Sequence, residues 1–512
     1  LPVWRTQIVR LPFASSCLLC HTLWKAMPMP PVMLAILTLV LGASAFAESG
    51  DQIHGADVNM YSADQLADFE HMRLHITFSE EDLRARRAQG RVEYDLKARG
   101  QTLTVLRLDA TDMTILDVQV DGDPVTWSYD DAVLLVPLPE PLLRGQATTV
   151  AVRYRIDDPP EGLYFVLPSE AEPDRPTMVY TLSEALWARY WLPSHDWPNE
   201  RWTSETSITV PASMTAITNG ELMETRSDPG GSSKTFSWRN EIPTDPHMMG
   251  FVIGELVEIA DDGSSPALPI YTQAGQEAAA RNTFRLVRPM IEFYSERLGV
   301  PFVFPSYTHV TVVEHVHGAM EQAGFSFVDP IWLTTGPQGE APEDWVERGY
   351  TAHMITHQWF GGIVNYRSVS QTWLNEGFAS YLDKLWVEQR HGAGEFGALM
   401  RQVAHKVTRT DDRQTGLPLV HRALDHANDI FTMGGGKIYG KGAWLLHMLR
   451  QRLGDDLFFE GVRRYLEENR WQGVETQDLR RTLEEVSGLD LEQFFQQWVY
   501  QGGVPLLNVA SS

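Results

Sequence analysis

Two histidines stand four residues apart in the stretch YTAHMITHQWFGG, residues 350–362. A proline at position 342 and the closing Gly-Gly pair predict a helix between them. In a helix, His353 and His357 project from one face and can bind one metal ion. With 16 histidines in 512 residues, about half a pair at this spacing is expected by chance, so the spacing alone is weak support. Two structural histidines, on the helix surface or in the core, are the alternative.

A carboxylate follows on a second predicted helix. The stretch TWLNEGFASYLD, residues 372–383, contains Glu376. Two neutral imidazoles and one carboxylate form a three-ligand zinc set that leaves the fourth position open. A solvated carboxylate is the weaker alternative, because the apolar neighbours of Glu376 require it to have a partner. We therefore predict that His353, His357 and Glu376 bind one zinc ion.

The residue after the first histidine is Met354. In the zinc-peptidase motif H-E-x-x-H, a glutamate that handles protons occupies this position. A thioether is only a weak hydrogen-bond acceptor and cannot carry a proton. Met354 is not at a ligand position, so the substitution affects proton transfer and not metal binding. The sequence therefore predicts zinc binding and leaves turnover open.

Length and composition limit the class of protein. A chain of 512 residues is long enough for two or three domains with sizeable cores. Its 43% apolar and 21% charged residues are ordinary for a soluble globular protein. The formal net charge of −25 argues against nucleic acid as a partner, because no basic excess is present to neutralise phosphates.

Residues 1–47 have the pattern of a leader with a signal peptide. They contain three basic residues and no acidic one, and the apolar run Val32–Ala47 ends in the small-x-small pattern of a signal-peptidase site. The run is short for a membrane span, which needs about 20 residues, so an uncleaved anchor is the weaker alternative. We expect export to the periplasm or the medium, and no stable membrane span after cleavage.

Both cysteines, Cys17 and Cys20, lie in this leader within CLLCH, which matches the c-type haem attachment pattern. They precede the apolar core of the signal peptide and would be removed with it. We therefore expect neither haem nor a disulfide in the exported protein.

The rest of the chain changes character near residue 268, after the Pro-, Gly- and Ser-rich stretch ADDGSSPALP. Residues 48–268 read mainly as strands, such as VEYDLKA and ATTVAVRYRI, and predict an all-β saddle- or sandwich-like domain. Residues 269–505 contain mainly helical patterns, among them one helix over 277–299. Residues 506–512 form a C-terminal tail. We expect a multidomain α+β protein.

Four stretches, in order along the chain, resemble one known family. They are TLSEALWARYWLPSHDWP, HGAMEQ, HMITHQWFGGIV with WLNEGFASY, and YGKGAWLLHMLRQRLGDDLFFEGVRRYL. They look like segments of the gluzincin aminopeptidases related to aminopeptidase N and leukotriene hydrolase. Four matches in order are far more specific than one. The resemblance implies a thermolysin-like zinc-peptidase domain over residues 269–505.

The resemblance also implies site roles. Tyr439 would donate a hydrogen bond to the oxyanion that forms during hydrolysis. Gly318, Ala319 and Met320 would pair their backbone with the substrate as an added strand. The alternatives are a tyrosine of the core for Tyr439 and surface glutamates for Glu184 and Glu321, and without the resemblance the surface position is the preferred interpretation of the two glutamates.

Two glutamates complete the implied site. Glu321, with Glu184, would hold the substrate's free α-ammonium, because a buried pair of carboxylates is costly without a cation. The expected partners are therefore peptides or protein N-termini. The resemblance predicts an exported zinc metallopeptidase of the aminopeptidase N type. The alternative is a pseudo-aminopeptidase that binds zinc and peptide N-termini without cleaving them, because Met354 occupies the general-base position.

Overall fold

The computed structural model describes residues 66–100, 102–261, 263–333, 349–413, 416–421, 424, 426–432 and 436–504. All of them belong to one compact unit, residues 55–512. The predicted leader with its signal peptide and CLLCH pattern, the predicted helix start at Pro342 and the predicted tail lie outside the described residues.

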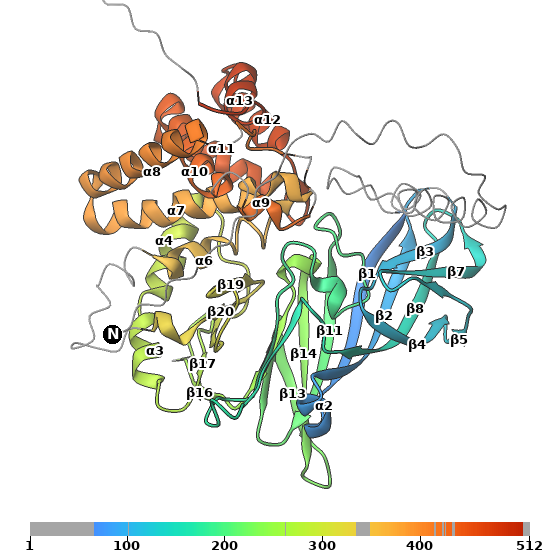
Figure 1. Cartoon of the computed structure of the whole chain (residues 1–512). Helices are drawn as coiled ribbons and strands as arrows, with labels where there is room; N and C mark the ends of the chain where they lie inside the picture. Colours follow the sequence, from blue (N-terminus) through green and yellow to red (C-terminus); the bar gives the residue numbers. More distant parts are fainter. Residues whose placement is uncertain are drawn as a thin grey trace, which may run out of the picture. The chain divides into compact units, whose positions relative to one another are not determined.

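The N-terminal part is built of strands, and its largest sheet has eight (Figure 1). β1 and β11 are parallel, and every other neighbouring pair is antiparallel. The order across the sheet is β13 (Glu221–Ser227), β14 (Ser233–Thr244), β11 (Trp202–Pro211), β1 (Ala67–Thr77), β2 (Arg87–Ala98), β8 (Ala147–Asp157), β4 (Met113–Val120) and β5 (Asp123–Pro124). Burial alternates at every position of β2, because successive side chains point to opposite faces and one face covers the core.

Two smaller sheets and a short helix complete this domain. The three-stranded sheet has the order β3 (Leu103–Asp109), β7 (Val133–Leu142), β6 (Ser128–Tyr129), and the four-stranded sheet has the order β12 (Thr215–Thr218), β15 (Phe251–Gly254), β10 (Met178–Thr181), β9 (Leu163–Val166), with helix α2 (Glu80–Arg84) after β1. Tyr94 and Tyr154 are fully buried, and their hydroxyls donate to the carbonyls of Pro193 and Trp191 at 2.9 Å. These bonds satisfy the polar ends of large core side chains.

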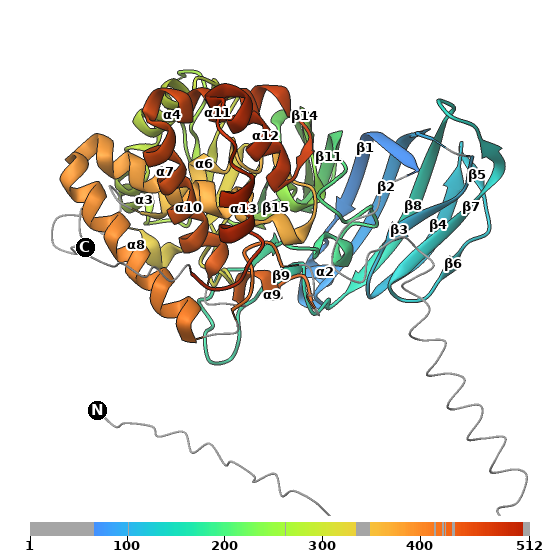
Figure 2. The ribbon, with the colours of Figure 1, turned by 90° about the horizontal axis from the view of Figure 1, so that it is seen from above.

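The second part combines a mixed sheet, whose strands are labelled in Figure 1, with helices that are seen from above in Figure 2. β17, β18 and β20 run parallel, and β16 and β19 are antiparallel to their neighbours. The sheet has the order β16 (Val257–Ile259), β17 (Ile270–Thr272), β18 (Thr308–Thr311), β20 (Phe325–Val328), β19 (Ala319–Gln322), and β21 (Asn365–Tyr366) pairs with β22 (Gly473–Val474). The boundary predicted at residue 268 lies between β16 and β17, which pair in this sheet.

Helices follow these strands for most of the remaining chain. They are α3 (Glu277–Thr283), α4 (Val287–Leu298), α6 (Tyr350–Thr356), α7 (Trp373–His391), α8 (Ala393–Arg413), α9 (Asp429–Thr432), α10 (Lys437–Leu453), α11 (Asp455–Glu468), α12 (Thr476–Ser487) and α13 (Glu492–Trp498). An all-β domain followed by a mainly helical one confirms the predicted fold class. The prediction of a single helix over 277–299 is wrong, because this segment forms two helices, α3 and α4. Phe284 stands at the break, where its ring stacks on His309 with a centroid distance of 4.0 Å.

Helices α7 and α10 cross at two glycines. A Cβ built on Gly442 would lie 2.7 Å from the Cα of Gly377, and the reverse distance is 2.9 Å. Only residues without a side chain allow two backbones to approach so closely. This crossing fixes the position of α7, on which Glu376 precedes Gly377.

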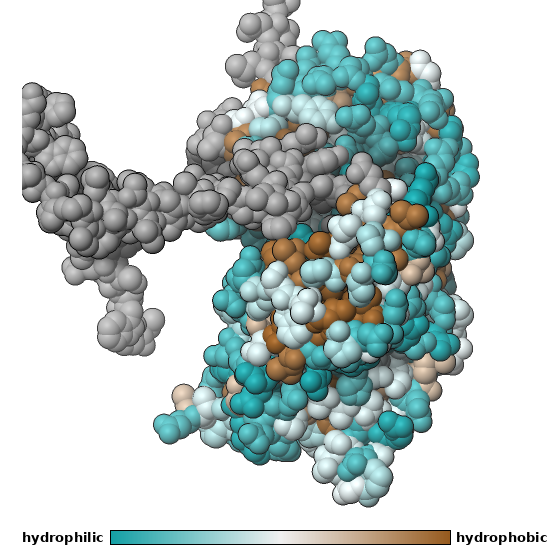
Figure 3. Space-filling model, turned by 90° about the vertical axis from the view of Figure 1, so that its right-hand side faces the viewer, coloured by the Kyte–Doolittle hydropathy of each residue, from teal (hydrophilic) through white to brown (hydrophobic). Residues whose placement is uncertain are grey.

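The face of the molecule drawn in Figure 3 is mostly hydrophilic and carries an apolar patch. Exposed apolar side chains of the β domain include Trp127, Leu143 and Met223. Within the part of the chain that the structure describes, every helix is too short or too polar to cross a membrane.

Candidate metal centre

The two histidines lie at the end of a short helix. His353 belongs to α6, and His357 follows its last residue with helical backbone angles, so the i, i+4 relation is kept. The chain then turns sharply: the N–H of Gly362 donates to the carbonyl of His357 at 2.8 Å. Gly361 has a φ of +138°, and a Cβ there would lie 2.9 Å from the same carbonyl oxygen. Glycine is therefore required to close this helix immediately after the second histidine.

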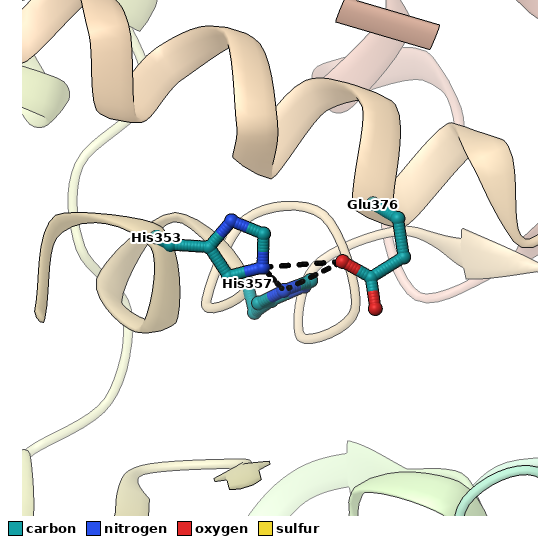
Figure 4. Close-up of side chains that lie close together, drawn as sticks. All are labelled: His353, His357 and Glu376. Atoms are coloured by element: carbon teal, nitrogen blue, oxygen red, sulfur yellow. Dashed lines mark hydrogen bonds and ion pairs between the residues drawn. The ribbon is translucent and has the colours of Figure 1, made fainter. Parts of the chain in front are cut away.

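The three predicted ligands converge on one point (Figure 4). Nε2 of His353 lies 3.1 Å from Nε2 of His357 and 3.1 Å from Oε2 of Glu376, and the third side of the triangle is 3.6 Å. In a tetrahedral zinc site with bonds of 2.0–2.1 Å, two ligand atoms are about 3.3–3.4 Å apart. The observed sides of 3.1, 3.1 and 3.6 Å lie within about 0.3 Å of this separation, so the residues fit a zinc ion.

Polar groups behind the two histidines orient their rings. Nδ1 of His357 lies 3.1 Å from the carbonyl oxygen of Phe360, so in the neutral ring the proton is on Nδ1 and Nε2 has its lone pair available for a metal ion. Nδ1 of His353 lies 3.9 Å from Oδ2 of Asp383. A carbonyl or carboxylate behind a histidine is the usual way to orient a metal ligand.

Electrostatics at the triangle favour a cation. Burial lowers the pKa of His357, but the carboxylates of Glu321 and Glu376 outweigh the effect of burial and raise this pKa to about 10. Burial would raise the pKa of Glu376, but hydrogen bonds to His353 and His357 hold it well below its usual range. The carboxylates therefore require a positive charge here, which a metal ion can provide in place of protons.

Met354 is buried, with 5% of its surface exposed. It lines a cavity of about 20 Å³ together with Tyr350, Trp332 and His309. A thioether at this position adds neither charge nor a proton carrier to the site. Its side chain is therefore part of an apolar contact where the family motif has a carboxylate.

Tyr439 lies on α10 beside the triangle. Its ring centroid is 6.3 Å from that of His353, and its hydroxyl hydrogen-bonds to Glu376. Burial, followed by the charges of Glu376 and Glu184, raises the pKa of Tyr439 well above its usual value. The hydroxyl therefore keeps its proton at neutral pH and can act as a hydrogen-bond donor.

The strand that begins after Gly318 is at an edge. β19 pairs with β20 on one side, and no described strand pairs with its other side. Gly318 has a φ of +79°, and a Cβ there would lie 2.9 Å from Nε1 of Trp332. The free side of Ala319 and Met320 can therefore pair with an extended chain.

Glu184 and Glu321 lie close together near the triangle. Oε1 of Glu321 is 3.4 Å from Nδ1 of His357 and has no hydrogen bond to any described group. Burial raises the pKa of Glu321, His357 lowers it and Glu184 raises it further, with a net rise. A carboxylate oxygen of Glu184, a ring nitrogen of His247 and a carboxylate oxygen of Glu321 all lie within 4.8 Å of one another. The two carboxylates thus form an acidic cluster of buried side chains next to the metal centre, which we call the acidic pocket.

The structure also brings in a residue that the sequence interpretation missed. Nε2 of His247, in a turn between β14 and β15, lies 3.1 Å from Oε1 of Glu184. Its local sequence, DPHMMG, has only an aspartate two residues earlier, which is too weak a signal to predict a site. The contact arises because segments far apart in the sequence meet.

Comparisons with known proteins agree with this fold. Residues 67–245 match the Peptidase M1 N-terminal domain, and residues 283–498 match the Peptidase family M1 domain. The chain therefore belongs to the M1 family of peptidases, whose members are zinc enzymes. The predicted resemblance is confirmed.

Individual relatives are aminopeptidases. The chain is 24% identical to a leucyl aminopeptidase of Saccharolobus solfataricus over 413 residues, 79% of this chain and 50% of that protein. It is 26% identical to the aminopeptidase N of Lactococcus lactis subsp. lactis over 419 residues, 79% of this chain and 48% of that protein. The chain spans about half the length of these curated relatives.

A solved structure has the same fold. The native yeast LTA4 hydrolase superposes with a TM-score of 0.73 at 19% identity, over 87% of this chain and 69% of that one. At this identity the likeness concerns the fold alone.

Proposed function

We propose that this protein is a zinc-dependent peptidase of the aminopeptidase N type, which removes N-terminal residues from peptides. One observation carries the proposal: the triangle of His353, His357 and Glu376 adjoins an acidic pocket formed by Glu184 and Glu321. A peptide whose α-ammonium enters this pocket presents its first carbonyl to the metal centre. The names of the relatives support this substrate class.

The chain's own groups have separate tasks in this proposal. When bound, a zinc ion supplies a Lewis acid that polarises a carbonyl and lowers the pKa of water. The hydroxyl of Tyr439 donates to the carbonyl oxygen as negative charge develops on it. The free side of β19 aligns the peptide backbone. Glu184 and Glu321 pair with the α-ammonium, which selects N-termini over internal peptide bonds.

A second candidate is a protein that binds zinc and peptide N-termini but does not cleave them. Met354 favours it, because the attacking water then has no carboxylate to take its proton and the leaving amine has no donor. Positioned acid–base catalysis contributes about 10²–10⁴-fold, which is about 3–5.5 kcal/mol of activation free energy. Zinc binding and substrate binding do not depend on this position.

One experiment separates the two candidates. The zinc content and the hydrolysis of aminoacyl chromogenic substrates are measured for the wild type and for Met354→Glu, with Met354→Gln as a control of similar shape that cannot carry a proton. The peptidase candidate requires measurable wild-type turnover that depends on zinc. Turnover only in Met354→Glu, about 10²–10⁴-fold above Met354→Gln, selects the binding protein. Absence of zinc from every variant would refute both.

We also propose that the protein is exported, on the strength of the signal-peptide pattern in residues 1–47. Expression of the full chain, followed by cell fractionation and N-terminal sequencing, tests this. Export predicts a mature N-terminus close to residue 48 in the periplasm or medium. An unprocessed chain in the cytoplasm would contradict it.

A further inference from the structure

The orientation of the buried side-chain amide of Asn365 determines which nitrogen of His247 carries a proton. The backbone N–H of Tyr366 donates to Oδ1 of Asn365 at 2.8 Å. A backbone N–H is always a donor, so the accepting atom must be the amide oxygen. The amide nitrogen of Asn365 therefore faces the opposite way, where it lies 2.9 Å from Oδ2 of Asp245 and 3.0 Å from Nδ1 of His247.

This orientation places the proton of His247. The amide N–H of Asn365 points at Nδ1, so Nδ1 of the neutral ring is an acceptor and Nε2 carries the hydrogen. Burial lowers the pKa of His247, but Glu184 and Asp245 outweigh it and raise it to about 9. The protonated ring has hydrogens on both nitrogens, with Nδ1 3.7 Å from Oδ1 of Asp245, so Nε2 is a donor in either state.

Among the described residues, the Nε2–H has one carboxylate within ion-pair distance. Oε1 of Glu184 lies 3.1 Å away, and no aligned hydrogen bond from Nε2 to any described group is formed. The hydroxyl of Tyr366 approaches the same oxygen at 3.4 Å, and its ring stacks on the imidazole with a centroid distance of 5.2 Å. His247 and Tyr366 thus both approach the same oxygen of Glu184, and ligand-capable atoms of Glu184 and Glu321 lie within 4.8 Å of each other.

The same network reaches the elements that carry the metal ligands. Nδ2 of Asn375, the residue before Glu376 on α7, donates to Oδ1 of Asn365 at 2.6 Å. Arg201 pairs with Asp245 at 3.2 Å and donates to the carbonyls of the two glycines that close the metal-binding helix, at 2.6 and 3.0 Å. His247 therefore has a fixed position relative to the metal triangle.

A second metal ion on Glu184, His247 and Glu321 is the competing explanation for this cluster. A histidine ligates through an unprotonated nitrogen, but Nε2 of His247 carries a proton. If the neutral ring carried its hydrogen on Nδ1 instead, that N–H would point at the amide N–H of Asn365, and two donors would face each other. The hydrogen bonds therefore assign this cluster to an organic cation rather than to a metal.

We propose that His247 is a positioning residue of the amine pocket, which holds Glu184 so that Glu184 and Glu321 together receive the α-ammonium of a peptide. This inference rests on the proposed function, because it presupposes that the pocket binds an N-terminus. His247 acts through Glu184 and not on the reacting atoms. Its loss therefore weakens recognition of the free amine and leaves zinc binding unchanged.

The test uses the zinc-loaded full chain and two inhibitors: leucine hydroxamate and its N-acetyl derivative, which lacks the ammonium. Dissociation constants are measured for the wild type, His247→Phe, which keeps the stacked ring, and His247→Gln, which keeps an N–H donor. A hydrogen bond to a charged group is worth about 1.5–3 kcal/mol, so we expect His247→Phe to reduce the preference for the free amine at least tenfold. His247→Gln should restore most of it, and the acetylated inhibitor should bind all three proteins alike.

The outcomes distinguish a failure of the proposed function from a failure of the role assigned to His247. If the wild type does not prefer the free amine, the proposed function fails. If the wild type prefers it and His247→Phe retains the full preference, the role of His247 is refuted. Nitrogen-15 NMR of the wild-type histidines provides a second test, because it shows directly which ring nitrogen of His247 carries the proton. The His247→Gln variant is needed only to assign the His247 signals. An unprotonated Nε2 on His247 at pH 7, or two zinc ions per chain, overturns the inference.

Discussion

The glycine crossing of α7 and α10 allows a direct test of how the metal site is held. In Gly442→Ala, the new Cβ would lie 2.7 Å from the Cα of Gly377, whereas ordinary contact begins at 3.4 Å, so the backbones must separate by about 3.4 − 2.7 = 0.7 Å to restore ordinary contact. Glu376 precedes Gly377 and moves with it. Zinc sites tolerate about 0.2 Å in their ligand distances.

Gly440→Ala is a matched control on the same helix, because its Cβ would meet nothing closer than 3.6 Å. Both substitutions gain about 1 kcal/mol of helix propensity, so this gain cancels when the variants are compared. Overpacking costs typically about 1–3 kcal/mol. We therefore expect Gly442→Ala to be less stable than Gly440→Ala by about this amount.

Zinc affinity provides the second measurement. Misplacing a supporting group typically weakens metal binding about 10–100-fold, so we expect such a loss in Gly442→Ala and none in Gly440→Ala. Urea unfolding of the metal-free proteins gives stability, and competition with a chromophoric chelator gives the zinc dissociation constant. Equal stability and equal zinc affinity in the two variants would falsify the claim that this crossing positions Glu376.

Three further predictions follow from the described contacts. Removing zinc should lower the melting temperature, because zinc at about 1,000 times its dissociation constant stabilises the folded state by about 4 kcal/mol; His353→Ala should melt at one temperature with or without chelator, and a chelator-sensitive variant would contradict the ligand assignment. Arg201→Met should cost about 3–5 kcal/mol in urea unfolding, because it leaves the buried carboxylate of Asp245 without its partner; the double variant with Asp245→Asn should recover part of this loss, and no recovery would mean that the ion pair is not the cause. Burial lowers the pKa of His195 to about 4 from 6.5, so the folded state resists protonation and stability is lost as pH falls from 6.5 towards 4. The loss is at most about 3 kcal/mol at 1.36 kcal/mol per pKa unit; the wild type should lose this much more than His195→Gln between pH 7 and pH 4, and parallel pH profiles would exclude His195 as the source.

The sequence by itself determined the features that depend on local spacing. Histidines at i and i+4 share a helix face whatever surrounds the helix, and alternating burial in a strand such as β2 follows from its pleat. These periodicities predicted the fold class and the residues of the metal triangle. Sequence resemblance added Glu184, Glu321 and Tyr439, which no spacing rule connects to the histidines.

Only the tertiary structure decided which distant groups meet. His247 and Asn365 are 118 residues apart and lie 3.0 Å from each other, and no local pattern encodes such a contact. At the break between α3 and α4, the ring of Phe284 likewise stacks on His309, which belongs to β18 of the sheet. Local backbone preferences act within a few residues, whereas the position of a buried donor relative to a carboxylate depends on how the packed elements fit together.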